Sequence, residues 1–309
     1  MDSYAPEQIR NVALIGHFGS GKTSIAEMMA FKAGSTKRLG SVDEGTSVSD
    51  YDPSEVERHI SINLAVLPLE WKGHKINVLD TPGYSDFSGE VKAGLRVADS
   101  VVAVVGGSSS VEVGTEQTWA FSREMELPGI VVVNKMDREN VDFPKILADL
   151  QSRISSRCVA AQLPIGTAAD FNGFVDLVTM KAIIEDAESE IPSAMVAEAQ
   201  AERDKLIEAV VEADDDLLNK YLEGGELSTE EIAGAVRAAT AQGIAVPVVV
   251  SAAGKGIGVP AMLDWFCSAL PSPVERQAAA GQPEASASAG LQALVFKTTA
   301  DPFTGKVIT

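Results

Sequence analysis

The sequence has 309 residues, 45% of them apolar and 22% charged, a balance that excludes a mainly disordered chain. Its formal net charge of −19 argues against a broad basic surface for nucleic acid, although residues 185–231 carry most of that charge and the rest is only mildly acidic. Two cysteines are too few for a disulfide framework, the N-terminus does not read as a secretory leader, and no apolar run approaches the ~18 residues of a membrane span. We therefore expect a reduced, cytoplasmic protein without a membrane segment.

Short apolar runs rich in β-branched residues recur along the chain between polar or turn residues. Because the runs are nearly continuous rather than alternating, they indicate strands buried on both faces of a parallel sheet. Helical stretches between them complete the alternation that is typical of a doubly wound α/β fold. The predicted strands are 12–15, 76–79, 101–105, 130–133 and 246–250, and the predicted helices include 23–31, 90–97 and 144–154.

Residues 162–243 lack the alternation of apolar strands and helices and interrupt this pattern. An apolar stripe at helical spacing predicts one long amphipathic helix that ends at Gly224. A second helix is expected to begin at Ser228, because Glu231 three residues later completes a capping box. We interpret the segment as an α+β subdomain inserted into a discontinuous domain of residues 1–161 and 244–275. Its acidic run fits a solvated helix face or, alternatively, a partner-binding surface. The stripe is Leu206, Val210, Ala213, Leu217 and Tyr221.

The C-terminal part changes in composition. A helix over 259–270 is expected to stop at Pro271. Residues 276–290 contain the Ala, Ser, Gly, Gln and Pro of a flexible linker. A strand is predicted over 291–296, with a turn beginning at Asp301. Residues 291–309 are too few for a core of their own, so we expect the start of a truncated second domain in the N-terminal part of a longer protein.

The segment Gly16 to Thr23 matches the pattern G-x-x-x-x-G-K-[ST] between a predicted strand and a predicted helix. Glycines let the backbone wrap phosphates closely, and the N–H groups at the helix start stabilise their charge. Lys22 would reach the β- and γ-phosphates, and the Thr23 hydroxyl would ligate Mg²⁺. The plainer alternative is a glycine-rich turn. The phosphate-binding prediction covers Gly16, Phe18, Gly19, Ser20, Gly21, Lys22, Thr23 and Ser24.

Asp80-Thr81-Pro82-Gly83 follows the predicted strand 76–79. An acid at the carboxyl end of a strand faces the ligand crevice of an open α/β sheet. Asp80 is therefore a candidate to hold Mg²⁺ through a water molecule, and the Gly83 N–H would contact the γ-phosphate. A lone sequence of this kind is also compatible with a tight turn.

Asn134-Lys135-Met136-Asp137 follows another buried strand and predicts recognition of guanine. The Asp137 carboxylate offers two acceptors to the N1–H and N2–H₂ of guanine, whereas adenine would leave it unpaired. Lys135 can cover the base with its aliphatic stem, and Asn134 can bridge to the phosphate loop. Without the other motifs, this tetrapeptide would equally fit a helix start. A weaker signal for the guanine O6 is the set of N–H groups of Ser251, Ala252 and Ala253.

Together these motifs make the sequence similar to the elongation factor G family of translational GTPases. Further likeness lies in 9–12, in Glu57-Arg58-His59-Ile60-Ser61-Ile62 against the family's switch I sequence E-R-G-I-T-I, and in 80–87 against D-T-P-G-H-x-D-F. Residues 162–166 and 173–178 resemble the subdomain special to that family, and 296–306 resemble the opening of its second domain. The resemblance implies a P-loop GTPase fold, GTP or GDP with Mg²⁺, and action on the ribosome, with the ribosomal stalk protein as a further partner.

Three departures from the family pattern bear on catalysis. Tyr84 stands where the family has the His that positions the attacking water, and Gly19 stands where its phosphate loop usually has Asp. In switch I, His59 replaces Gly and Ser61 replaces Thr. Ser61 keeps a hydroxyl and is a Mg²⁺ ligand candidate. The catalytic prediction is Tyr84 for water and Lys22 for phosphate charge, with Phe18 and Ile60 matching the apolar pair beside the water.

Two functions follow from these residues. The first is GTP hydrolysis stimulated by the ribosome. The second is a ribosome-associated GTP-binding switch that hydrolyses GTP slowly or not at all and does not translocate. A generic small GTPase is disfavoured by the insertion. We expect a monomer.

Overall fold

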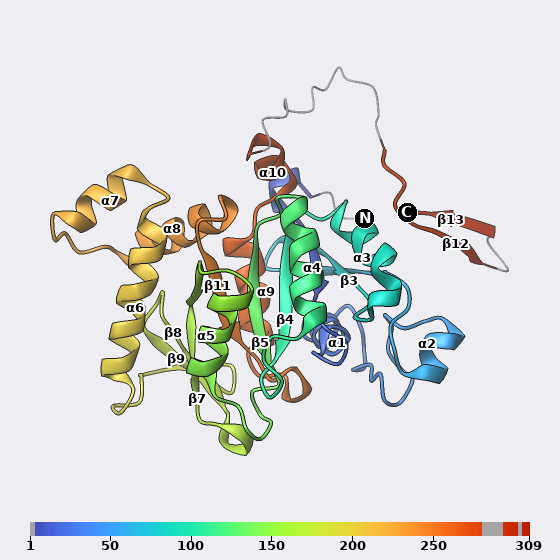
Figure 1. Cartoon of the computed structure of the whole chain (residues 1–309), viewed down its shortest axis with the longest axis horizontal. Helices are drawn as coiled ribbons and strands as arrows, with labels where there is room; N and C mark the ends of the chain where they lie inside the picture. Colours follow the sequence, from blue (N-terminus) through green and yellow to red (C-terminus); the bar gives the residue numbers. More distant parts are fainter. Residues whose placement is uncertain (1–3, 280–292, 302–304) are drawn as a thin grey trace.

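The computed structural model describes residues 4–279, 293–301 and 305–309, and its centre is a seven-stranded sheet (Figure 1). The strand order is β2-β3-β1-β4-β5-β11-β6, and every neighbouring pair is parallel except β2 with β3. All residues of β4, β5 and β11 are buried, as expected for strands covered on both faces. The strands are β1 (Ile9–Ile15), β2 (Ala65–Trp71), β3 (His74–Asp80), β4 (Ser100–Gly106), β5 (Gly129–Asn134), β6 (Cys158–Ala160) and β11 (Val246–Val250).

Helices cover both faces of this sheet. α1 (Lys22–Lys32) contacts α9 (Val259–Ala269), and α3 (Ser88–Leu95) contacts α4 (Val113–Glu124), whose ribbon lies in front of the central strands in Figure 1. α9 ends before Pro271, as predicted. No helix in the described part of the chain has the length and apolar character needed to cross a membrane. The other helices here are α2 (Pro53–Arg58), α5 (Phe143–Arg153), α10 (Pro273–Ala279) and the short 3₁₀ turns η1 (Pro6–Gln8), η2 (Ser85–Phe87) and η4 (Ala253–Lys255).

The chain between β6 and β11 forms a second, antiparallel sheet with the order β10-β9-β8-β7 and three helices (Figure 1). α8 begins after Ser228, whose side chain accepts a bond from the Glu231 N–H, so the predicted capping box is confirmed. The predicted fold class, a doubly wound sheet with an additional α+β part, is confirmed. The domain boundaries themselves stay a prediction. The elements are β7 (Gln162–Ile165), η3 (Ala168–Asp170), β8 (Gly173–Asp176), β9 (Lys181–Ile184), β10 (Ala187–Ser189), α6 (Val196–Val211), α7 (Asp215–Leu222) and α8 (Thr229–Ala241).

Two predictions of local structure are wrong. The long helix predicted from the apolar stripe is two helices, α6 and α7, because Asp214 has an extended backbone and its carboxylate accepts the N–H groups of Asp216 and Leu217. Within the predicted strand 291–296, residues 293–296 are not a strand; instead β12 (Thr298–Asp301) pairs with β13 (Gly305–Ile308). The predicted linker begins inside α10, and 280–290 lie outside the described residues.

Candidate functional site

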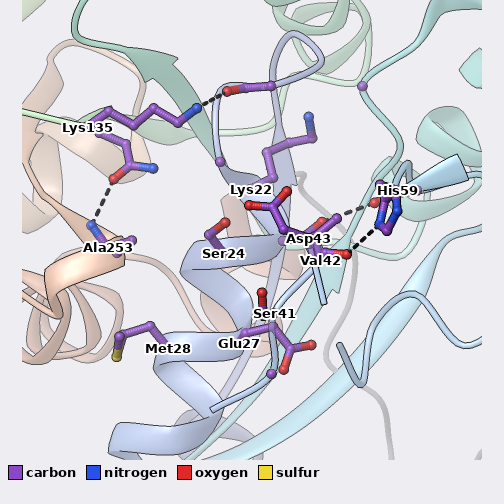
Figure 2. A pocket seen from close by; sticks show the side chains of 18 of the residues that line it. Lys22, Ser24, Glu27, Met28, Ser41, Val42, Asp43, His59, Lys135 and Ala253 are labelled. Carbon is purple, nitrogen blue, oxygen red and sulfur yellow. Dashed lines mark hydrogen bonds between the residues drawn. The ribbon is translucent and has the colours of Figure 1, made fainter. Parts of the chain in front are cut away.

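A cavity of about 450 Å³ opens beyond the carboxyl ends of β1, β3, β5 and β11, within the usual size range of ligand sites (Figure 2). It brings together most of the residues that the three sequence motifs predicted. Those that line it are Phe18, Gly19, Gly21, Lys22, Thr23, Ser24, Ser61, Gly83, Asn134, Lys135, Asp137 and Ala253. The predicted residues Gly16, Ser20, Asp80, Tyr84, Ser251 and Ala252 belong to the same loops but do not line it.

The phosphate loop takes a conformation that its glycines permit. Gly21 has φ +96° and is the residue before the first turn of α1, and a Cβ there would collide with the Asn134 amide. Gly16 has φ +136°, and a Cβ there would collide with the Val104 carbonyl oxygen. At both positions only glycine fits without strain. Since Gly21, Lys22 and Thr23 line the cavity, the first turn of α1 borders it with N–H groups that lack partners within the helix.

Lys22 is buried, and its Nζ donates to the carbonyl oxygens of Gly16 and His17 at 3.0 Å each. Burial lowers the pKa of Lys22 to about 8, and the carboxylates of Asp80 and Asp50 oppose that shift. Gly83 passes so close that a Cβ there would lie 2.7 Å from Lys22 Nζ. Burial disfavours the charged form of Lys22, and an anionic ligand beside the ammonium would stabilise that form.

The predicted Mg²⁺ ligands converge. The hydroxyls of Thr23 and Ser61 lie 3.0 Å apart, although 38 residues separate them in the sequence. Asp80 is 1% exposed, and neither carboxylate oxygen has a hydrogen-bond partner among the described residues. Burial raises the pKa of Asp80 to about 7, while the Thr23 hydroxyl and the Lys22 ammonium oppose the shift. A buried, unpaired carboxylate next to two hydroxyls fits a hard cation with oxygen ligands, so these residues suit Mg²⁺.

Three buried acids that the sequence did not single out surround this centre. Asp50 has one oxygen without a partner among the described residues, and burial raises its pKa. Glu27 lines the cavity from α1, and one of its oxygens accepts from the Ser47 hydroxyl and from the N–H groups of Val48 and Ser49 at 2.7–2.9 Å. These bonds attach the segment before α2 to the helix that follows the phosphate loop.

Glu55 is the third buried acid. It holds the backbone after α2 by accepting from its N–H groups, as Glu27 does for the segment before α2. It accepts from the N–H groups of Ile62 and Asn63 at 2.8 and 2.7 Å, and from the Asp52 N–H at 3.0 Å. The backbone that follows Ser61 is thereby fixed, which keeps its hydroxyl next to Thr23. The pattern from Asp52 to Glu55 is a capping box, so a sequence signal for part of this role was present.

The base-reading loops are joined by Asn134, which is buried. Its Nδ2 donates to the Ser20 carbonyl and its Oδ1 accepts from the Ala253 N–H, both at 3.1 Å. Lys135 donates to the Gly19 carbonyl at 2.6 Å, and Figure 2 draws this bond and the one from the Ala253 N–H. Asp137 lines the cavity at half-buried exposure. The side-chain arrangement therefore joins the phosphate loop to the predicted base loop.

The N–H groups at 251–253, predicted to meet guanine O6, each have a partner within the protein, and their contact with O6 stays a prediction. The Ser251 N–H donates to the Val133 carbonyl, the Ala252 N–H to the Ile257 carbonyl, and the Ala253 N–H to Asn134. All three donors are paired within the protein, so the short loop holds its own shape with them.

Tyr84 lies beside the cavity and not in its lining. Its ring stacks on Phe18 with centroids 4.1 Å apart and an interplanar angle of 29°. Tyr84 is 38% exposed, and Phe18 lines the cavity. The structure thus places the predicted catalytic side chain against an apolar ring of the phosphate loop.

Comparisons with known proteins agree with this geometry. Residues 7–272 match the family described as elongation factor Tu GTP binding domain. The chain is 37% identical to elongation factor G of Thermotoga petrophila and to that of Thermotoga neapolitana, over 98% of the chain and 46% of each relative. A crystal structure of a Thermus thermophilus protein superposes with a TM-score of 0.88 at 35% identity, covering 98% of this chain and 45% of that one. The chain thus spans about half the length of the curated relatives it matches.

Proposed function

The chain belongs to the elongation factor Tu GTP-binding domain family, and we propose that it acts as an elongation factor G-type GTPase that binds GTP and GDP with Mg²⁺ and hydrolyses GTP to GDP and phosphate. One observation carries this proposal. A single cavity has the buried ammonium of Lys22 and two close hydroxyls in one part, and the loop of Asn134 and Asp137 in another. A nucleoside triphosphate is the ligand class that needs both.

In the proposed complex, Lys22 exchanges its carbonyl partners for the β- and γ-phosphates. The Thr23 and Ser61 hydroxyls and the Asp80 carboxylate would hold Mg²⁺. The ion would supply charge neutralisation at the phosphates. Gly83 lies against Phe18 and the end of Lys22, and we assign its N–H to the γ-phosphate.

Guanine selectivity is assigned to Asp137, whose carboxylate pairs with two N–H donors that adenine lacks. Lys135, held by the Gly19 carbonyl, covers the base with its stem. We place the activity on the ribosome in the cytoplasm, as the elongation factor G relatives suggest, with the stalk protein as a further partner and a monomeric chain.

The second candidate function is a GTP-dependent switch with little hydrolysis, and the stacking of Tyr84 on Phe18 favours it. A water-positioning group must lie within hydrogen-bonding reach of the attacking water, and small displacements cost large factors in rate. The phenol of Tyr84 would have to leave its ring contact before it could act.

The test is phosphate release by the full chain with and without ribosomes, measured in the parent and in Tyr84→His. Strong stimulation by ribosomes in the parent supports the hydrolase and rejects the switch. No stimulation in the parent but stimulation of Tyr84→His supports the switch. If neither protein binds GTP in an equilibrium titration, the proposed function itself is wrong.

A further inference from the structure

One wall of the nucleotide cavity is a loop that carries few bonds to the rest of the protein. Leu39 to Asp43 line the cavity from this side. The loop, residues 39–46, is closed on itself: the Ser41 N–H donates to the Thr46 hydroxyl, the Thr46 N–H to the Ser41 carbonyl, and the Gly45 N–H to the Val42 carbonyl. These bonds give the loop a shape but do not attach it to the sheet domain.

Buried Gly40 packs against Glu27 of α1, and His59, at the end of α2, adds a hydrogen bond to the loop. The His59 Nδ1 lies 2.9 Å from the Val42 carbonyl oxygen, and its ring also lines the cavity (Figure 2). Among the hydrogen bonds of the described residues, this is the only one that reaches residues 39–46 from outside that stretch. The neighbouring segments are fixed independently, by Glu27 at 47–49 and by Glu55 at 62–63.

The backbone of His59 ends α2 in the left-handed region. It has φ 54° and ψ 41°, a conformation that glycine enters freely and that asparagine, aspartate and histidine adopt more often than other residues. The His59 N–H donates to the Glu55 carbonyl as the cap of α2, so the helix end sets this backbone conformation and directs the side chain toward Val42.

The bond also defines the donor. A carbonyl oxygen only accepts, so Nδ1 carries the proton and donates. Asparagine places its Nδ2 donor at the same distance from the backbone as histidine Nδ1 and tolerates the left-handed region. Aspartate has the same shape as asparagine but no donor.

We propose that His59 is a positioning residue that latches the loop 39–46 over a bound guanine nucleotide and slows its release. The inference rests on the proposed nucleotide binding at this cavity. When the bond between His59 and Val42 opens, the wall of Leu39 to Asp43 is free to move away from the cavity. The nucleotide then leaves by the side that the latch had closed.

The experiment measures the dissociation rate of radiolabelled GDP, chased with unlabelled GDP in Mg²⁺, from the full chain and from three variants. His59→Gly and His59→Asp remove the donor and should release GDP about two- to tenfold faster, the range for one net hydrogen bond. His59→Asn keeps the donor and should release GDP close to the parent rate. Glu57→Gln, an exposed change on the same helix, is the matched control and should match the parent.

The variants separate the latch from a merely structural role. His59→Gly suits the left-handed backbone at the end of α2, so its unfolding temperature should stay close to that of the parent although it releases GDP faster. Equal release rates in the parent, His59→Gly and His59→Asp would overturn the latch, as would equally fast release from His59→Asn and His59→Asp. If the parent binds no guanine nucleotide, the proposed function fails instead, and the two failures are distinct.

Discussion

Asn134 joins the phosphate loop to the base-reading loops, and its removal should weaken both folding and binding. Asn134→Ala deletes the bonds to the Ser20 carbonyl and from the Ala253 N–H, each 3.1 Å long and buried. A lost hydrogen bond costs about 1 kcal/mol, and a buried donor left unpaired adds about 1–3 kcal/mol. The two lost bonds and the unpaired Ala253 N–H should together lower the free energy of unfolding without nucleotide by about 3–5 kcal/mol, measured by urea titration.

The nucleotide contribution is tested by repeating the titration with Mg²⁺ and GDP at about 100 times the dissociation constant of the parent. Bound ligand then stabilises the parent by about 2.7 kcal/mol. If the variant binds tenfold more weakly, the gap between the two proteins widens by about 1.4 kcal/mol. Asn172→Ala, an exposed asparagine without a side-chain hydrogen bond among the described residues, is the control and should change neither titration. A gap that is the same with and without GDP would refute the reasoning that Asn134 positions the nucleotide loops.

Three further outcomes are expected. Asp137→Asn should weaken GDP by about 1–3 kcal/mol and favour xanthosine diphosphate, because the amide donates where the carboxylate accepted; an unchanged guanine preference in competition titrations would exclude Asp137 as the base reader. Burial raises the pKa of Asp99 to about 6, above the ~3.9 of an unfolded chain, so the folded state holds the proton more tightly and stability falls as pH rises from about 4 to 6. Asp99→Asn cannot ionise, so its free energy of unfolding relative to the parent should rise between about pH 4 and 6 in urea titrations. A difference between the two proteins that stays constant with pH would contradict the raised pKa of Asp99. Burial raises the pKa of the Cys158 thiol to about 12, so Cys158 should resist a disulfide reagent at about pH 8 until urea is added. Prompt labelling of Cys158 itself in the folded chain, distinguished from labelling of the half-buried Cys267, would contradict this.

The central sheet was predictable because its strands are buried on both faces and read as continuous apolar runs. β2 was not predicted from that signal. It is the antiparallel edge strand, and its residues alternate between buried and exposed, with Val66, Pro68 and Glu70 outside. Pro68 is tolerated there because an edge strand leaves one side without ladder partners. The apolar stripe across α6 and α7 misled for a different reason, since the capping side chain of Asp214 interrupts the backbone without interrupting the stripe.

The phosphate and base loops were predictable because each is a contiguous motif whose geometry is local. The supporting carboxylates were not, because their partners lie elsewhere in the chain. Glu27 binds residues about twenty positions later, and only the folded loop brings their N–H groups to it. Ser61 was predicted from the resemblance, whereas the reason that it meets Thr23 is the buried Glu55, which became evident from the fold.

Nucleotide binding and GTP hydrolysis, the two parts of the proposed activity, depend on contacts of different strength. Lys22 and Asn134 are each held by two hydrogen bonds, whereas Tyr84 is held beside the cavity by one ring contact with Phe18. An aromatic pair contributes about 0.5–1.5 kcal/mol beyond its buried area, and about 1.36 kcal/mol corresponds to a tenfold change in rate. The ring-specific part of the contact between Tyr84 and Phe18 therefore accounts for a slowing of about tenfold. If Tyr84→His raises the rate of hydrolysis by well over tenfold, the stacking on Phe18 does not explain the slow rate of the parent. The cause would then be the poor geometry of the hydrogen bond between the Tyr84 hydroxyl and the attacking water.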